Sequence, residues 1–116
     1  MSNFNWFSDE EIKGLQGNLP AMLDLARGIA GVPFHLTSTI GGLHLPNSTH
    51  YKGLAADIGL GNLNEGFDRD TVRFAILKGL IGAGFKRLEI CEKHFHVDIG
   101  ESPEYPSPVV WLGTDS

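Results

Sequence analysis

Two short segments contain most of the side chains that could perform chemistry. Residues 50–57 read HYKGLAAD and residues 92–98 read EKHFHVD. Side chains alternate between the two faces of a strand, so every second residue of the later segment is predicted to share one face. These four titratable residues are Glu92, His94, His96 and Asp98. Such a face can be a solvated sheet surface, but two histidines beside two carboxylates favour metal binding.

Zinc chemistry connects the two segments. A catalytic zinc takes three protein ligands from His, Asp or Glu and leaves one position for water. His50, Asp57 and His96 would supply two imidazoles and one carboxylate, and we expect them to hold one Zn²⁺ per chain. Other first-row metals would also suit this ligand set. Taken alone, Asp57 has a second interpretation, as a structural aspartate bonded to loop amides.

Hydrolysis by a metal-activated water also needs a group that moves protons. His94 is the first choice because it shares the strand face of His96, and Glu92 is the second choice or instead orients His94. Asp98 is predicted to accept a hydrogen bond from a ligand imidazole, outside the metal ligands themselves. A simple surface carboxylate is the alternative for Asp98.

The surrounding pattern predicts the elements that position these residues. Helical spacing of apolar residues predicts helices over residues 20–29 and 69–83. Runs of β-forming residues predict strands over residues 34–39, 54–58, 85–90 and 93–99. This order indicates one α+β domain with a small antiparallel sheet and helices packed on one face. The domain is expected to span residues 1–116, with a core over about 8–100.

Local signals refine the predicted boundaries. Ser8 and Glu11 match a capping box ahead of the first helix, and Asp68 is placed to cap the second. The tail, residues 101–116, holds three prolines and is predicted to be an irregular strap pinned by Trp111 and Leu112. The inward residues expected in the second helix are Val72, Ala75, Ile76, Leu80 and Ile81.

Composition excludes several classes of function. The 116-residue chain carries a net charge of −5 and no cluster of basic residues, which argues against nucleic-acid binding. No window approaches the roughly 20 apolar residues of a membrane span. Cys91 is the only cysteine, so no intrachain disulfide forms. We expect Cys91 to be a small buried strand residue, with a thiolate ligand or a nucleophile as alternatives.

Residues 47–58, NSTHYKGLAADI, resemble the Ser-x-His-x-x-Gly-x-Ala-x-Asp signature of the D-Ala-D-Ala peptidase superfamily. That group includes D-Ala-D-Ala carboxypeptidases and dipeptidases, phage L-alanyl-D-glutamate endolysins and the hedgehog signalling domain. The matching fixed positions are Ser48, His50, Gly53, Ala55 and Asp57. The stretch from His94 to His96 resembles the family's His-x-His element, in which the second histidine is the ligand and the first is catalytic. The resemblance extends over roughly residues 34–99 and implies a hedgehog-like α+β domain with one zinc and peptidase activity on cell-wall peptides.

Three positions depart from or extend the family pattern. Many members carry an arginine soon after the strand that precedes the loop, but residues 37–42 read TSTIGG. Arg27, Arg69 or Lys52 would have to bind a substrate carboxylate instead. Lys93 occupies a position where several members have an acidic base, which leaves that role to His94 or Glu92.

His44 lies six residues before His50, where hedgehog domains also have a histidine near the metal. It would bind substrate or polarise its carbonyl, with a solvent-exposed loop histidine as the alternative. His35, within a predicted strand, is expected to be structural.

The resulting hypothesis is a phage-type peptidase that hydrolyses peptidoglycan stem peptides, either as a D-Ala-D-Ala carboxypeptidase or as an L-Ala-D-Glu endopeptidase. The N-terminal residues show no signal-peptide pattern, which predicts synthesis in the cytoplasm and release to the cell wall at lysis. Two alternatives are a zinc-containing binding module without catalysis and a structural phage component. The pattern predicts no oligomeric state.

Overall fold

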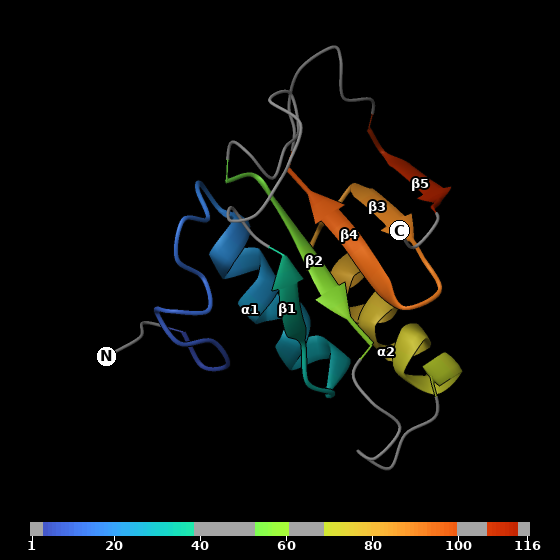
Figure 1. The fold of residues 1–116 in the computed structure, drawn as a ribbon, viewed down its shortest axis with the longest axis horizontal. Coiled ribbons are helices and arrows are strands. Elements are labelled where there is room, and N and C mark those ends of the chain that lie inside the picture. The colour runs from blue at the N-terminus through green and yellow to red at the C-terminus, as the bar shows by residue number, and fades with distance from the viewer. Residues whose placement is uncertain (1–3, 39–52, 61–68, 100–106, 114–116) are drawn as a thin grey trace.

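The computed structural model describes residues 4–38, 53–60, 69–99 and 107–113 (Figure 1). These residues form a small α+β domain with two helices and a five-stranded mixed sheet. The elements are α1 (Leu19–Ala30), β1 (His35–Ser38), β2 (Ala55–Gly59), α2 (Arg69–Gly82), β3 (Arg87–Ile90), β4 (His94–Asp98) and β5 (Val109–Leu112).

The strands lie in the order β1-β2-β4-β3-β5. The first three pairings are antiparallel, whereas β5 runs parallel to β3. The prediction of an antiparallel sheet was therefore wrong at this edge. The prediction of an irregular strap was also wrong for the residues that form β5. The backbone N–H of Val109 donates to the carbonyl of Lys86 at 2.7 Å, and that of Gly113 donates to Ile90 at 3.0 Å. The C-terminal segment thus becomes a strand because β3 offers it an open edge.

Both helices lie on one face of the sheet, behind it in Figure 1, as predicted. The helices approach each other closely at Gly79, where a Cβ atom would collide with the carbonyl oxygen of Ala26. The core lies between this helical layer and the sheet. Its fully buried residues from the sheet and from α1 include Leu19, Leu23, Ala56, Ile58, Leu88, Phe95 and Val97. The apolar half of each central strand is therefore used to hold the helices.

Both helices match their predicted ranges to within one residue at each end. Gly31, with φ +72°, ends α1 in a left-handed conformation that suits glycine. The capping box of Ser8 and Glu11 forms through reciprocal bonds of 2.9 and 3.3 Å, but only turns follow it before α1. Asp68 lies outside the described residues.

Two apolar side chains were predicted to pack and do not. Ile81 is 57% exposed, because the buried stripe of α2 follows Val72, Ile76 and Leu80 at four-residue steps and Ile81 lies beside it. Leu112 is 83% exposed on the edge strand β5. Its neighbour Trp111 is half-buried and packs near the rings and side chains of His96 and Arg87.

Candidate metal centre

The candidate site lies on the sheet face opposite the helices. Asp57 in β2 and His96 in β4 are direct cross-strand partners. Their immediate neighbours in sequence point into the core, so strand alternation turns Asp57 and His96 to the outer face. The antiparallel register of β2 and β4 thus brings together two residues that are 39 positions apart in the chain.

The imidazole of His96 lies between two carboxylates. Its Nδ1 atom is 3.2 Å from Oδ1 of Asp57, and its Nε2 atom is 2.9 Å from Oδ2 of Asp98. The side chains of His96, Asp57 and Asp98 are 14%, 20% and 1% exposed. Asp98 is therefore a buried group that contacts His96, and the alternative of a surface carboxylate was wrong.

These contacts change the pKa of His96. Burial alone lowers the pKa, because it disfavours the charged imidazolium. Hydrogen bonds to Asp57 and Asp98, together with their negative charges, outweigh that effect and raise the pKa of His96 from 6.5 to about 9. In the metal-free protein His96 is therefore a protonated imidazole at neutral pH, and its positive charge lies between the carboxylates of Asp57 and Asp98.

Two residues that sequence reasoning missed support Asp98. Nε of Arg87 donates to Oδ1 of Asp98 at 2.5 Å, and the Arg87 side chain is only 11% exposed. The guanidinium lies over the ring of Trp111, 5.2 Å from its centroid, and the His96 ring is 6.1 Å from the same ring. The register of the β3–β4 hairpin would have revealed the Arg87–Asp98 pair, but that register depends on where the turn falls.

The separation of Asp57 and His96 can be compared with that of two ligands of one zinc ion. Two donor atoms bound to one tetrahedral zinc at about 2.0–2.2 Å are roughly 3.3–3.6 Å apart. The Nδ1–Oδ1 separation of 3.2 Å is close to this range. Within the described ranges, no group of three or more His, Cys, Asp or Glu side chains could hold a metal. The third predicted ligand, His50, lies outside those ranges, as do His44 and Ser48.

The two predicted proton-transfer groups lie in different surroundings. His94 is half-buried in β4, on the same face as His96 and across from Gly59 of β2. Glu92 does not share that face, because β4 begins only at His94. Its carboxylate is 73% exposed and lies 3.8 Å from Arg69 at the start of α2. The predicted alternation was therefore wrong for Glu92.

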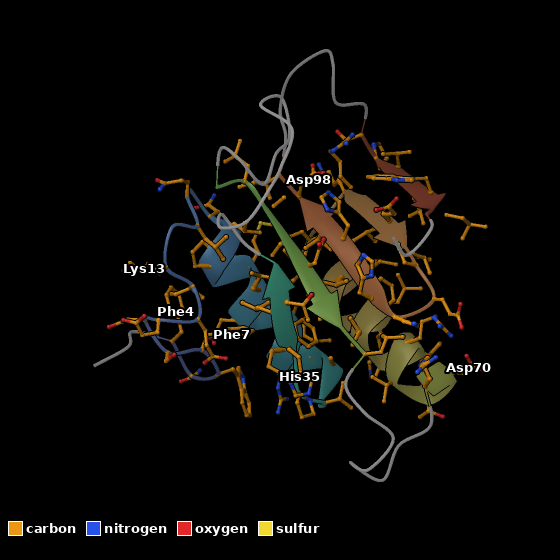
Figure 2. All side chains as sticks on the ribbon, viewed as in Figure 1. Phe4, Phe7, Lys13, His35, Asp70 and Asp98 are labelled. Carbon is orange, nitrogen blue, oxygen red and sulfur yellow. The ribbon has the colours of Figure 1, made fainter. Side chains whose placement is uncertain are left out.

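The remaining candidate residues lie away from the centre. His35 is exposed on the edge strand β1, and Figure 2 shows it at the opposite end of the sheet from Asp98. Cys91 is buried in the turn after β3 rather than within a strand. A cavity of about 260 Å³ adjoins the site at the end of β4, and among the described residues its charged lining groups are Lys86, Arg87 and Asp98.

Comparison of the chain with protein-family models, with curated proteins and with solved structures finds no match. Among the described residues, neither helix is long and apolar enough to span a membrane.

Proposed function

We propose that this chain is a zinc-dependent peptidase that hydrolyses peptidoglycan stem peptides. The observation that carries the proposal is the pairing of Asp57 and His96 at 3.2 Å on the outer face of the sheet. These residues belong to two separate segments of the signature, and the fold brings their side chains together. A site of this kind needs its ligands fixed before the metal arrives, and two neighbouring strands provide that rigidity.

The residues that would hold the metal are His50, Asp57 and His96. When bound, zinc would polarise the scissile carbonyl and lower the pKa of a bound water to about 7. His96 would bind through Nδ1, the atom that faces Asp57. Asp98 would accept the hydrogen bond from the other ring nitrogen of His96 and hold the ring in place.

His94 is the residue that we propose as proton shuttle. Its position two residues before His96 on the same strand face leaves it beside the metal ligands, and its half-buried side chain is at the surface where a peptide would bind. Glu92 fits this role less well, because its carboxylate faces Arg69.

The substrate class rests on the resemblance of residues 47–58 and 94–96 to the cell-wall peptidase signature. The side chains suggested for binding a terminal carboxylate give the carboxypeptidase form little support. Arg27 stacks on the ring of Trp6 at 4.1 Å and belongs to α1, on the helical side of the sheet. Arg69 lies near Glu92, and Lys52 is outside the described residues. We therefore favour the L-Ala-D-Glu endopeptidase form.

Metal content and peptide hydrolysis test this proposal together. We expect about one zinc per chain in the wild type, with loss of zinc in His50→Ala and His96→Ala. His35→Ala is the matched control, because it removes a histidine from the same sheet without touching the site, and it should keep both zinc and activity. His94→Ala should keep zinc and lose hydrolysis of purified muropeptides.

The outcomes separate the competing functions. A wild-type protein that binds zinc but cleaves neither whole cell walls nor muropeptides would be a binding module. A wild type that takes up no zinc when zinc is offered would contradict the metal centre itself and leave a structural component as the better interpretation.

A further inference from the structure

We propose that Glu89 of β3 and Trp111 of β5 form a subsite for a cationic side chain of the substrate peptide. Glu89 binds the ammonium group of that side chain, and the Trp111 ring contacts the methylene groups that carry it. The inference deepens the proposed function and rests on it for where the peptide lies. Both residues lie outside the peptidase signature.

The sheet register places Glu89 beside the candidate metal centre. His96 is the cross-strand partner of Asp57 on one side and of Glu89 on the other. Glu89 is in turn the partner of Trp111. Four neighbouring strands therefore contribute one row of side chains to the outer face, namely Asp57, His96, Glu89 and Trp111. Because strands lie about 4.8 Å apart, the backbone of Glu89 is about one strand spacing from His96.

Glu89 differs from two other carboxylates of this face in its partners. Asp57 and Asp98 both contact His96, and Asp98 also accepts a hydrogen bond from Arg87. The side chain of Glu89 forms no hydrogen bond or ion pair with any of the described residues. It is nevertheless half-buried. A carboxylate that has lost part of its hydration without gaining a partner is stabilised by a bound cation.

Contact with Gly113 determines where the carboxylate of Glu89 lies. A Cβ atom at Gly113 would collide with this carboxylate and with the carbon atoms next to it. The Glu89 side chain therefore lies over the backbone of Gly113, directly after β5. Gly113 is held in this place because its N–H donates to the carbonyl of Ile90 at 3.0 Å. A side chain at position 113 would displace the carboxylate of Glu89.

The position of Glu89 indicates which kind of cation binds there. The peptide bond to be cleaved lies at Asp57 and His96, and Glu89 is one strand further along the row. A lysine-type side chain carries its ammonium group on a flexible four-carbon stem, which can extend from one strand to the next. The half-buried ring of Trp111 gives that stem an apolar surface. The substrate class is therefore a stem peptide with a side-chain amine close to the cleaved bond.

The test measures binding of two peptides to the full-length protein supplied with zinc. The first is N-acetyl-L-Ala-D-Glu-L-Lys with a ketomethylene group in place of the bond to be cleaved. The second carries an acetyl group on the lysine Nε, which removes the charge and keeps the stem. By titration calorimetry, we expect the wild type to bind the first peptide about 5–10-fold more tightly. In Glu89→Gln the two peptides should bind equally.

Two further variants isolate the contact with the ammonium group. Glu10→Gln is the matched control, because it removes the same charge from an exposed position in the turns before α1, and it should keep the wild-type preference. Gly113→Ala keeps the carboxylate but displaces it, and it should reduce the preference. A ratio between two peptides is informative because structural damage weakens the binding of both alike.

A third peptide separates two sources of an ammonium group. It has a free N-terminal amine and an acetylated lysine, and it should bind as weakly as the second peptide. If it binds as tightly as the first, Glu89 recognises the N-terminus of the peptide, and the side-chain subsite is overturned.

The outcomes distinguish the inference from the proposed function, because cleavage of the matching amide peptides is measured separately. If Glu89→Gln abolishes the preference but the wild type cleaves neither peptide, the peptidase function fails and the subsite stands. If the wild type cleaves them but binds both equally, or if Glu89→Gln keeps the preference, the subsite is overturned and the peptidase stands. A wild type that binds neither peptide also overturns the inference. Should Glu89→Gln not fold, as judged by circular dichroism, an unchanged preference in Gly113→Ala would overturn it.

Discussion

The central strands β2 and β4 have one apolar face and one face that carries titratable side chains. On the helical side, Ala56, Ile58, Phe95 and Val97 are completely buried. On the other side, the intervening positions carry Asp57 and the titratable residues of β4. The same ten residues thus support the core and the candidate site at once. The alternation of side chains along each strand thus places the residues that stabilise the fold on one face of the sheet and the candidate site residues on the other.

The polar face is nevertheless not an ordinary solvated surface. Asp98 is almost fully buried, and Arg87 and His96 are nearly so. Buried charges cost free energy unless each finds a partner. Here the chain Trp111, Arg87, Asp98, His96 and Asp57 gives every member a contact. Substitutions on this face should therefore affect stability as well as metal binding, which distinguishes it from a simple binding surface.

The largest effect is expected on the apolar face. Phe95→Ala would remove the largest fully buried side chain among the described residues and leave a cavity between β4 and the helices. We expect a loss of about 3–5 kcal/mol in the free energy of unfolding, measured by urea denaturation. Phe74→Ala is the control, because Phe74 is 70% exposed. This variant should change the free energy of unfolding by no more than about 0.5 kcal/mol. Equal effects of the two variants would contradict the assignment of the core.

A somewhat smaller effect is expected from Asp98→Ala on the polar face. The change leaves the charge of Arg87 buried without its partner, and we expect a loss of about 3 kcal/mol in metal-free protein. The double variant Arg87→Met with Asp98→Ala should recover part of this loss, because no charge is then stranded. A single variant as stable as the wild type would show that the polar face is solvated after all.

The pH dependence of stability should identify His96 in the metal-free protein. The pKa of His96 is raised from 6.5 to about 9, so the folded state binds its proton more tightly than the unfolded state. This contribution is fully present below about pH 6.5 and is lost as the pH rises to about 9, by on the order of 3 kcal/mol. Urea denaturation at a series of pH values, with chelator present, measures it. The His96→Gln variant should lack this slope, and a wild type without the slope would argue against the paired carboxylates.

The smallest effect is expected at the edge of the sheet. Leu112 is 83% exposed, so Leu112→Ser should change the free energy of unfolding by less than about 0.5 kcal/mol. Thermal denaturation of this variant beside the wild type is sufficient as a measurement. A large loss would mean that a part of the chain outside the described residues covers Leu112.

Local patterns were sufficient for much of the fold. The helices could be predicted because apolar residues recur at helical spacing and because glycines end both segments, as Gly31 and Gly84 do with positive φ. The common face of His94, His96 and Asp98 followed from strand alternation alone. These predictions succeeded because each depends on the geometry of a few consecutive residues.

Errors arose where long-range pairing decides the outcome. Glu92 does not lie on the predicted strand face, because the turn between β3 and β4 extends as far as Lys93. The C-terminal segment became β5 because it found a partner in β3, more than 20 positions earlier. No local signal distinguishes such a strand from an irregular tail, since its stability comes from the edge that it pairs with.

The amino-acid sequence by itself thus determined the two helices, the first four strands and the residue types that could bind a metal. Only the tertiary structure decided that Asp57 and His96 face each other, that Asp98 is buried, and that Arg87 and Trp111 complete its surroundings. The physical reason is that alternation depends on the local backbone, whereas the contacts of a buried charge depend on the register between strands that are distant in the chain.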